Sequence, residues 1–353
     1  KDYVNPALEE DHFFRSLPAP RTPPLIALFK SHGALNAAQI QTLKSLLSGK
    51  ASLKEQDTMC RTALMYAVQH NSVDVVQMLL DAKSSPKEYD YRNLTPLTFA
   101  LHAKNSDVAM LLLKKKAHVD DMDDDHRSPL IHAIAVQNVD IVKYLLKHKA
   151  DLNADCNELM TPVTYAVQTG NVDILRVLLD AKATPHSADI EGCSPVMLAA
   201  AKGDVPIMKM LLEAKAKFDA QGRDGDGMTP LMCAVRGSRA SAAAVNEIIK
   251  AKADVNAVSD DGGTALMFAA AAGQMECIRA LIAAKADVEA RNNKSMTALM
   301  LAAENKHVEA AQLIHDLSKT AENAALAVRG AKRAQDRVKE DDDDEPPAKR
   351  RRR

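Results

Sequence analysis

Eleven histidines and five cysteines are the side chains of this chain most able to bind a metal or act as a nucleophile. No two histidines stand four residues apart, and the sequence has no Gly-x-Ser-x-Gly, His-Glu-x-x-His or phosphate-binding glycine motif. The cysteines form no Cys-x-x-Cys pair and match no metal-site spacing; they are Cys60, Cys156, Cys193, Cys233 and Cys277. We therefore expect a non-catalytic protein without a cofactor or metal.

Two clusters of polar residues are better candidates for binding. Aspartates crowd residues 120–125, but this stretch lacks the glycine and the distal glutamate of a calcium loop, which disfavours calcium binding. A second cluster earlier in the chain carries tyrosine and arginine, the residue types that dominate protein interfaces. We expect both clusters to contact a partner protein through Tyr89, Tyr91, Arg92, Asp121, Asp123 and Asp124.

The elements that position these residues recur along the chain. A block of Thr or Ser, then Pro or Ala, then Leu or Val returns at a spacing of 33 residues, with two steps of 35. A fixed period of this size indicates stacked supersecondary units with one elongated core. The blocks begin at Thr62, Thr95, Ser128, Thr161, Ser194, Thr229, Thr264 and Thr297.

Residues 95–127 show the structure expected of one unit. Thr95 is suited to cap a helix, and proline is well tolerated in the first turn that follows. This first helix should run to about residue 103, and a short turn should lead into a second helix with an apolar stripe. The second helix should end near residues 115–116, before a polar, extended loop.

These residues closely resemble the ankyrin repeat. The sequence Thr161-Pro162-Val163-Thr164-Tyr165-Ala166 and the later Ala253-Asp254-Val255-Asn256 match the family pattern well. The resemblance implies an all-α solenoid over residues 21–318, with about eight clear repeats. A degenerate N-terminal capping repeat should precede them, with helices at residues 25–29 and 37–47. It also implies finger loops and a concave face that bind another protein.

The resemblance places further candidates on the concave face formed by the first helices. Aromatic residues recur just before the conserved alanine, and their period favours a place in the core for Tyr66, Phe99, Tyr165 and Phe268. The polar candidates for contact with a partner are Gln69, His70, His102, Gln168, Lys202 and Arg236. The chain is expected to act as a monomeric scaffold or adaptor.

A lysine replaces the family's glycine just past the second helix of each repeat. The lysines are Lys50, Lys83, Lys116, Lys149, Lys182, Lys215, Lys252 and Lys285. That position usually has a left-handed backbone, so we expect a positive φ at most of them, unless the helix ends were rebuilt. A basic ridge that binds nucleic acid is an alternative function. Copying of one ancestral unit explains the row more simply.

The net charge, the cysteines and the ends of the chain give indications of the cellular compartment. A net charge of −1 predicts no general attraction to membranes or nucleic acid, and scattered cysteines suit a reducing compartment. Residues 1–20 should be loosely ordered. Residues 319–339 could form a helix with a sparse apolar stripe, ahead of a disordered acidic and basic tail.

The last residues resemble a short nuclear import signal and would be recognised by an import receptor. The signal comprises Lys349, Arg350, Arg351 and Arg352. We therefore expect the protein in the nucleus, the cytoplasm or both. Because the sequence begins at Lys1, a further alternative is that it is the regulatory part of a larger enzyme.

Overall fold

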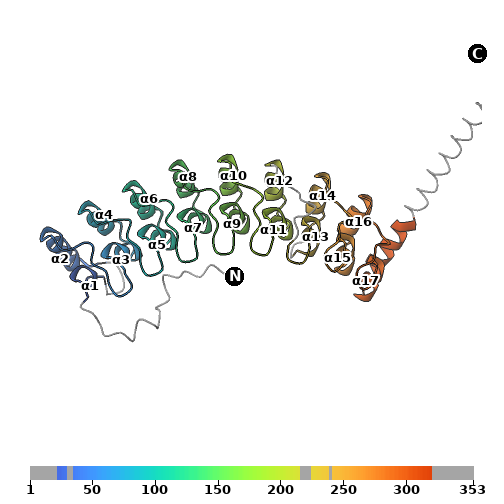
Figure 1. Cartoon of the computed structure of the whole chain (residues 1–353), viewed down its shortest axis with the longest axis horizontal. Helices are drawn as coiled ribbons and strands as arrows, with labels where there is room; N and C mark the ends of the chain where they lie inside the picture. Colours follow the sequence, from blue (N-terminus) through green and yellow to red (C-terminus); the bar gives the residue numbers. More distant parts are fainter. Residues whose placement is uncertain (1–21, 30–34, 215–223, 238–240, 320–353) are drawn as a thin grey trace, which may run out of the picture. The chain divides into compact units, whose positions relative to one another are not determined.

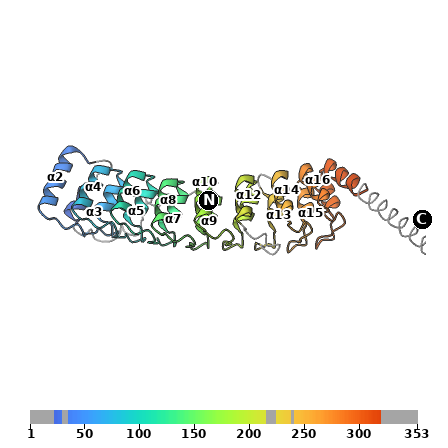
Figure 2. The same cartoon turned by 90° about the horizontal axis from the view of Figure 1, so that it is seen from above.

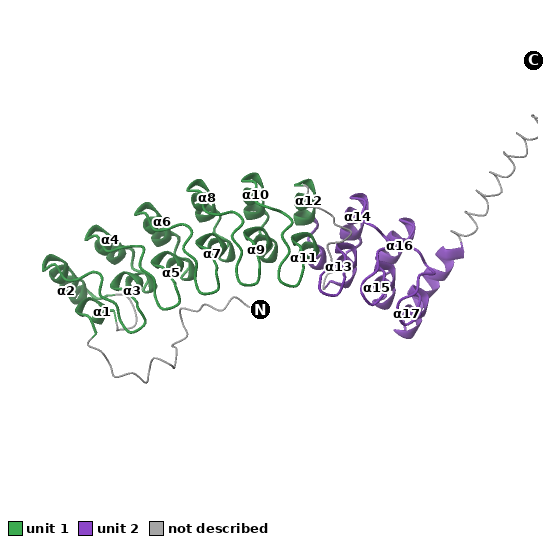
Figure 3. Cartoon of the chain, viewed as in Figure 1, with its two compact units in different colours: residues 1–199, 206–217 green, residues 200–205, 218–353 purple. Residues whose placement is uncertain are grey.

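The structure, a computed structural model, describes residues 22–29, 35–214, 224–237 and 241–319. Regular secondary structure in this part of the chain is α-helical, which confirms the all-α prediction. The chain divides into two compact units, coloured separately in Figure 3. Unit 1 comprises residues 1–199 and 206–217, and unit 2 comprises residues 200–205 and 218–353.

Unit 1 is built from pairs of short helices. The helices of each pair lie in two layers, odd-numbered helices in one and even-numbered helices in the other (Figures 1 and 2). Their bounds are α1 Pro24–Ala27, α2 Ala37–Ser48, α3 Ala63–Gln69, α4 Val73–Asp81, α5 Pro96–His102, α6 Ser106–Lys114, α7 Pro129–Ala135, α8 Val139–Lys147, α9 Pro162–Thr169 and α10 Val172–Asp180. The division between the units passes through α11 (Pro195–Lys202) and α12 (Val205–Glu213).

The first helices of unit 1 begin where the sequence predicts. The hydroxyl of the Thr or Ser that precedes each helix accepts a hydrogen bond from the backbone N–H three residues later, as Thr95 does from Thr98 at 3.3 Å. Proline occupies the first helical position of α5, α7 and α9, where a missing N–H leaves no bond unmade. Local chemistry therefore defines the start of each repeat.

Stacking of successive repeats creates the core of unit 1. Helices α3, α5, α7 and α9 contact one another in order, and so do α4, α6, α8 and α10. The leucine or valine of the repeated block lies between the stacked helices, and Leu64, Leu97, Leu130 and Val163 are all 0% exposed. Each repeat therefore needs its neighbours, as well as its own helix pair, to bury its apolar residues.

Unit 2 follows the same plan with fewer helices. It contains α13 (Pro230–Arg236), α14 (Ala242–Lys250), α15 (Ala265–Ala271), α16 (Met275–Ala283) and α17 (Ala298–Glu304), followed by a helix over residues 308–319. Helix α15 contacts α13 and α17, and α14 contacts α16. No helix in the described residues of either unit is long and apolar enough to cross a membrane.

The prediction for the lysine row is confirmed. The seven described lysines have φ between 57° and 71°, whereas Lys215 lies outside the described residues. At the C-terminal end of α4, the N–H of Lys83 donates to the carbonyl of Leu80 at 3.0 Å. The N–H of Ser84 donates to the carbonyl of Leu79 at 2.9 Å. The usual left-handed helix end is thus kept, although lysine fits it less well than glycine.

The predicted N-terminal repeat is present, as α1 and α2, with bounds within two residues of those expected. Its second helix begins with a capping box, in which Asn36 and Gln39 exchange side-chain bonds with each other's backbone N–H. Residues 1–20, predicted to be loosely ordered, lie outside the described residues. So do residues 320–353, which hold most of the possible helix over 319–339 and the tail predicted to be disordered.

Candidate partner-binding surface

Six of the finger loops are each organised by one buried or half-buried Asp or Asn side chain; Cys156 and Ser259 occupy the equivalent position in two others. The Oδ1 atom of this Asp or Asn accepts hydrogen bonds from the backbone N–H groups two and four residues later. In Asp90, for example, these bonds come from Arg92 at 2.9 Å and Leu94 at 3.0 Å. The residues in this role are Asp57, Asp90, Asp123, Asp189, Asp224 and Asn292.

Backbone hydrogen bonds join the tips of successive fingers. In unit 1 the N–H of Tyr91 donates to the carbonyl of Met59 at 3.1 Å, and that of Asp124 donates to Arg92 at 3.2 Å. The series continues with Asn157 to Asp125 at 3.1 Å and Ile190 to Glu158 at 3.0 Å. Unit 2 has its own pairs, Asp260 to Asp226 and Asn293 to Asp261. The tips within a unit therefore form one connected row.

The second carboxylate oxygen of the finger aspartate reaches the first helix or its start. The Tyr66 hydroxyl donates to Oδ2 of Asp57 at 2.6 Å, and Nε of Arg61 lies 3.4 Å from Oδ2 of Asp90. Burial raises the pKa of Tyr66, and the Asp57 acceptor raises it further. The tyrosine therefore acts as a hydrogen-bond donor that fixes the finger against α3, the first helix of its repeat.

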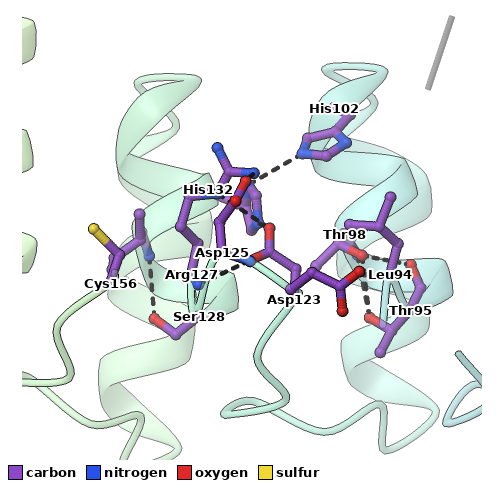
Figure 4. A network of polar contacts seen from close by, with 12 residues as sticks. Leu94, Thr95, Thr98, His102, Asp123, Asp125, Arg127, Ser128, His132 and Cys156 are labelled. Carbon is purple, nitrogen blue, oxygen red and sulfur yellow. Dashed lines mark hydrogen bonds and ion pairs between the residues drawn. The ribbon is translucent and has the colours of Figure 1, made fainter. Parts of the chain in front are cut away.

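Repeats 2 and 3 of the eight clear ones meet at a buried histidine pair, shown in Figure 4. His102 Nε2 and His132 Nδ1 are 3.1 Å apart, and His132 Nε2 is 2.9 Å from Oδ2 of Asp123. Arg127 Nε approaches the same oxygen at 3.1 Å. His132 is 0% exposed, Asp123 is 4% exposed and His102 is 5% exposed. The network links the inner helices α5 and α7 to one finger.

The charges in this network follow from burial. Desolvation lowers the pKa of His132 and, with the neighbouring His132 ring, lowers that of His102 to about 3, so both rings are neutral near pH 7. Burial alone would raise the pKa of Asp123, but the bonds from His132 and Arg127 outweigh it and lower the value to about 2. The carboxylate can only accept, so we assign the His132 proton to Nε2, and His102 Nε2 donates to His132 Nδ1.

Acid is expected to destabilise unit 1 through His102. Its folded-state pKa of about 3 lies below the unfolded value of about 6.5, so the unfolded chain binds more protons between these values. Stability is therefore complete above the unfolded pKa and falls as the pH drops, by up to about 1.4 kcal/mol per pH unit. Urea unfolding followed by circular dichroism at about pH 7 and about pH 5 measures this loss, and His102→Gln should reduce it. If the variant lost as much stability between these pH values as the natural chain, His102 would not be the cause.

Two predicted contact residues are buried, and their assignment to the exposed surface was wrong. Asp123 belongs to the acidic stretch, but its carboxylate turns inward to organise the finger. His102 was assigned to the concave face, but the His132 ring in the next repeat covers it. Among the aromatics expected in the core, Phe99 is 1% exposed, whereas Tyr66, Tyr165 and Phe268 are only half-buried.

The other predicted contact residues that the structure describes are exposed or half-buried, and they lie in several places. The tips that carry Tyr89 and Asp124 are neighbours, because Asn93 Nδ2 donates to Oδ1 of Asp124 at 2.6 Å. Tyr89 is 60% exposed, and Asp124, Gln168 and Arg236 are exposed too. Half-buried positions are Tyr91, Arg92, Asp121, Gln69, His70 and Lys202. The residues Lys349, Arg350, Arg351 and Arg352 lie outside the described part of the chain.

Sequence reasoning missed the partners of the buried aspartates. His132 replaces the aromatic residue that four other repeats carry just before the conserved alanine, and Arg127 precedes the repeated block. The recurrence of Asp57, Asp90 and Asp123 at the repeat period was a usable signal for an inward-facing carboxylate. Within the described residues no group of three or more histidine, cysteine or acidic side chains is placed to hold a metal ion.

Stacked helix pairs with hydrogen-bonded fingers define a helical repeat protein whose accessible side chains lie on finger tips and inner helices. A family model described as "Ankyrin repeats (3 copies)" matches residues 31–123, 116–189, 181–243 and 238–323. The chain therefore belongs to the ankyrin-repeat family. Ankyrin repeats are generally modules of protein–protein interaction, and their fold is typically non-catalytic.

A solved structure supports the same fold. The crystal structure of the human ASB11 ankyrin repeat domain is similar, with a TM-score of 0.56 and 24% sequence identity. The similarity covers 64% of this chain and 98% of that one. No curated protein matches the sequence.

Proposed function

We propose that the protein is a non-catalytic scaffold or adaptor that binds another protein through the finger row of unit 1. The observation that carries this proposal is the connected row of tips, because it holds exposed side chains in fixed order. Tyr89 is 60% exposed, Met122 40%, Leu159 47% and Ile190 68%. Apolar and aromatic side chains held rigidly at a surface lose little conformational freedom on binding, which favours affinity.

Charge on the same tips adds selectivity. Asp124, Asp125, Glu158 and Glu191 are exposed beside these apolar side chains. Arg127 lies in this region, but it pairs with Asp123 and Asp125 inside its own finger. The negative charge lies on the tips after Tyr89, whereas Arg92 and the exposed Lys87 lie near Tyr89 itself. The acidic part of the row would attract a partner with a basic contact region and repel an acidic one.

The test is a binding measurement with a protein partner captured by residues 21–318. Tyr89→Ala and Ile190→Ala should each weaken that binding by about tenfold or more, the usual effect of losing an interface anchor. Tyr144→Ala is the matched control, because Tyr144 lies on the second helix α8 and stacks on His148 away from the fingers. Equal binding by all three variants would refute a finger-row interface.

We infer a nuclear or nucleocytoplasmic location from the basic cluster Lys349–Arg352. A reporter fused to residues 340–353 should enter the nucleus, and alanine at the four basic positions should abolish entry. Nucleic-acid binding through the lysine row is the second candidate. It predicts a steep loss of affinity between about 50 and 200 mM salt. The ion pair of the adjacent Lys115 with Asp81, at 2.9 Å, reduces the positive charge along this edge and favours the protein partner.

A further inference from the structure

The last helix pair of unit 2 exposes a face that the earlier repeats bury. In α17 this face is formed by Leu299, 36% exposed, Met300, 41% exposed, and the exposed Ala303. The equivalent residues of α15 are Leu266, Met267 and Ala270, which are 0%, 2% and 0% exposed. They are buried because α17 packs against α15. The same positions in every earlier first helix are also at most 2% exposed.

This face is a stacking surface without a partner among the described residues. A helical repeat array needs a terminal unit with a polar outer face to stay soluble. Here the outer positions are Leu, Met and Ala, which are the residue types used at the internal interfaces. A contiguous apolar surface of this kind marks a place where another segment packs.

We propose that residues 324–328 of the same chain cover this face. They read Ala324-Ala325-Leu326-Ala327-Val328, and this mixture of small and aliphatic residues matches the Ala-Leu-Met-Phe-Ala-Ala-Ala of α15. They follow closely after the helix of residues 308–319, which belongs to the same repeat as α17. The segment therefore starts beside the surface that it covers.

Two considerations favour this segment over a second copy of the chain. The exposed face is provided by one short helix and its neighbour, which is small compared with the roughly 800 Å² per partner of a stable interface. A tethered segment needs much less contact, because its effective concentration is in the millimolar range. The sparse apolar content of residues 319–339, which by itself suggests weak docking, is then sufficient.

Hydrogen exchange of the full-length chain tests this proposal. The double variant Leu326→Asp, Val328→Asp should raise amide exchange in α17 by about tenfold or more, because charge cannot be buried against Leu299 and Met300. Val338→Asp, in the same tail but beyond the proposed segment, is the matched control and should leave exchange unchanged. In the reciprocal experiment, Leu299→Asp on the covered face should lower the protection of residues 324–328 from amide exchange.

Two outcomes would overturn the proposal. Unchanged exchange in α17 of the double variant, with the circular dichroism spectrum also unchanged, would show that the segment does not cover the face. Protection of α17 that disappears on dilution, together with a dimer in sedimentation, would assign the face to a second copy of the chain.

Discussion

Glycine at Lys83, Lys116, Lys149 and Lys182 together is expected to raise the unfolding free energy of unit 1 by about 2 to 4 kcal/mol. Their φ angles are 71°, 67°, 63° and 71°, in a region that costs a residue with a Cβ about 1–2 kcal/mol. Glycine removes this strain. It also removes a cation at the helix C-terminus, worth about 0.3–1 kcal/mol. The balance is a gain of about 0.5–1 kcal/mol per site, and urea unfolding would measure the sum.

Alanine at the same four lysines is the matched control. The alanine side chain keeps the Cβ and hence the strain, but it loses the cation, so this variant should be less stable than the natural chain. All four lysine side chains are exposed, so neither substitution removes packing. If the glycine and alanine variants were equally stable, the backbone conformation would not be the source of the effect.

His132→Ala is expected to lower the unfolding free energy by about 3–5 kcal/mol, because it removes a large buried side chain and a hydrogen-bond donor to a buried carboxylate. His132 is 0% exposed and bonds both Asp123 and His102. Its loss leaves the Asp123 carboxylate buried with less compensation and opens a cavity between α5 and α7. Urea unfolding of the variant and of the natural chain, monitored by circular dichroism, measures this change in the unfolding free energy.

His132→Tyr should recover much of that loss. Tyr66 occupies the equivalent position of an earlier repeat and donates to Asp57 at 2.6 Å. A tyrosine at position 132 can therefore replace the bond to Asp123, although not the bond to His102. If the tyrosine variant were no more stable than the alanine variant, the hydrogen bond to Asp123 would not be the source of the stability.

The chain's local structure was predictable because short-range interactions control it. Thr95 caps α5 through an N–H only three residues away, and Lys83 adopts a left-handed backbone to satisfy carbonyls of its own helix. Such contacts recur in the described copies, so the sequence shows them repeatedly. The ankyrin family, the helix bounds and the positive φ of the lysines all followed from this repetition.

The candidate surface was predicted less well, because exposure depends on neighbours one repeat away. Asp121, Asp123 and Asp124 were given the same predicted role, yet only Asp123 turns inward. Its Oδ1 accepts two backbone hydrogen bonds, and its Oδ2 lies against His132. His102 was predicted to be accessible because the family resemblance places it on the concave face. The ring of His132, in the next repeat, covers it.

By itself, then, the sequence determined the repeat, the helix pairs and their caps, since each depends on residues a few positions apart. Only the tertiary structure decided which side chains the buried aspartate meets, which histidines pair and which end face is left exposed. The inward Asp123 meets His132 nine residues later, whereas the histidine pair and the covered end face depend on residues about one repeat apart. Leu266 and Leu299 have the same sequence context, and they differ only because α17 covers the first and no described residue covers the second to the same extent.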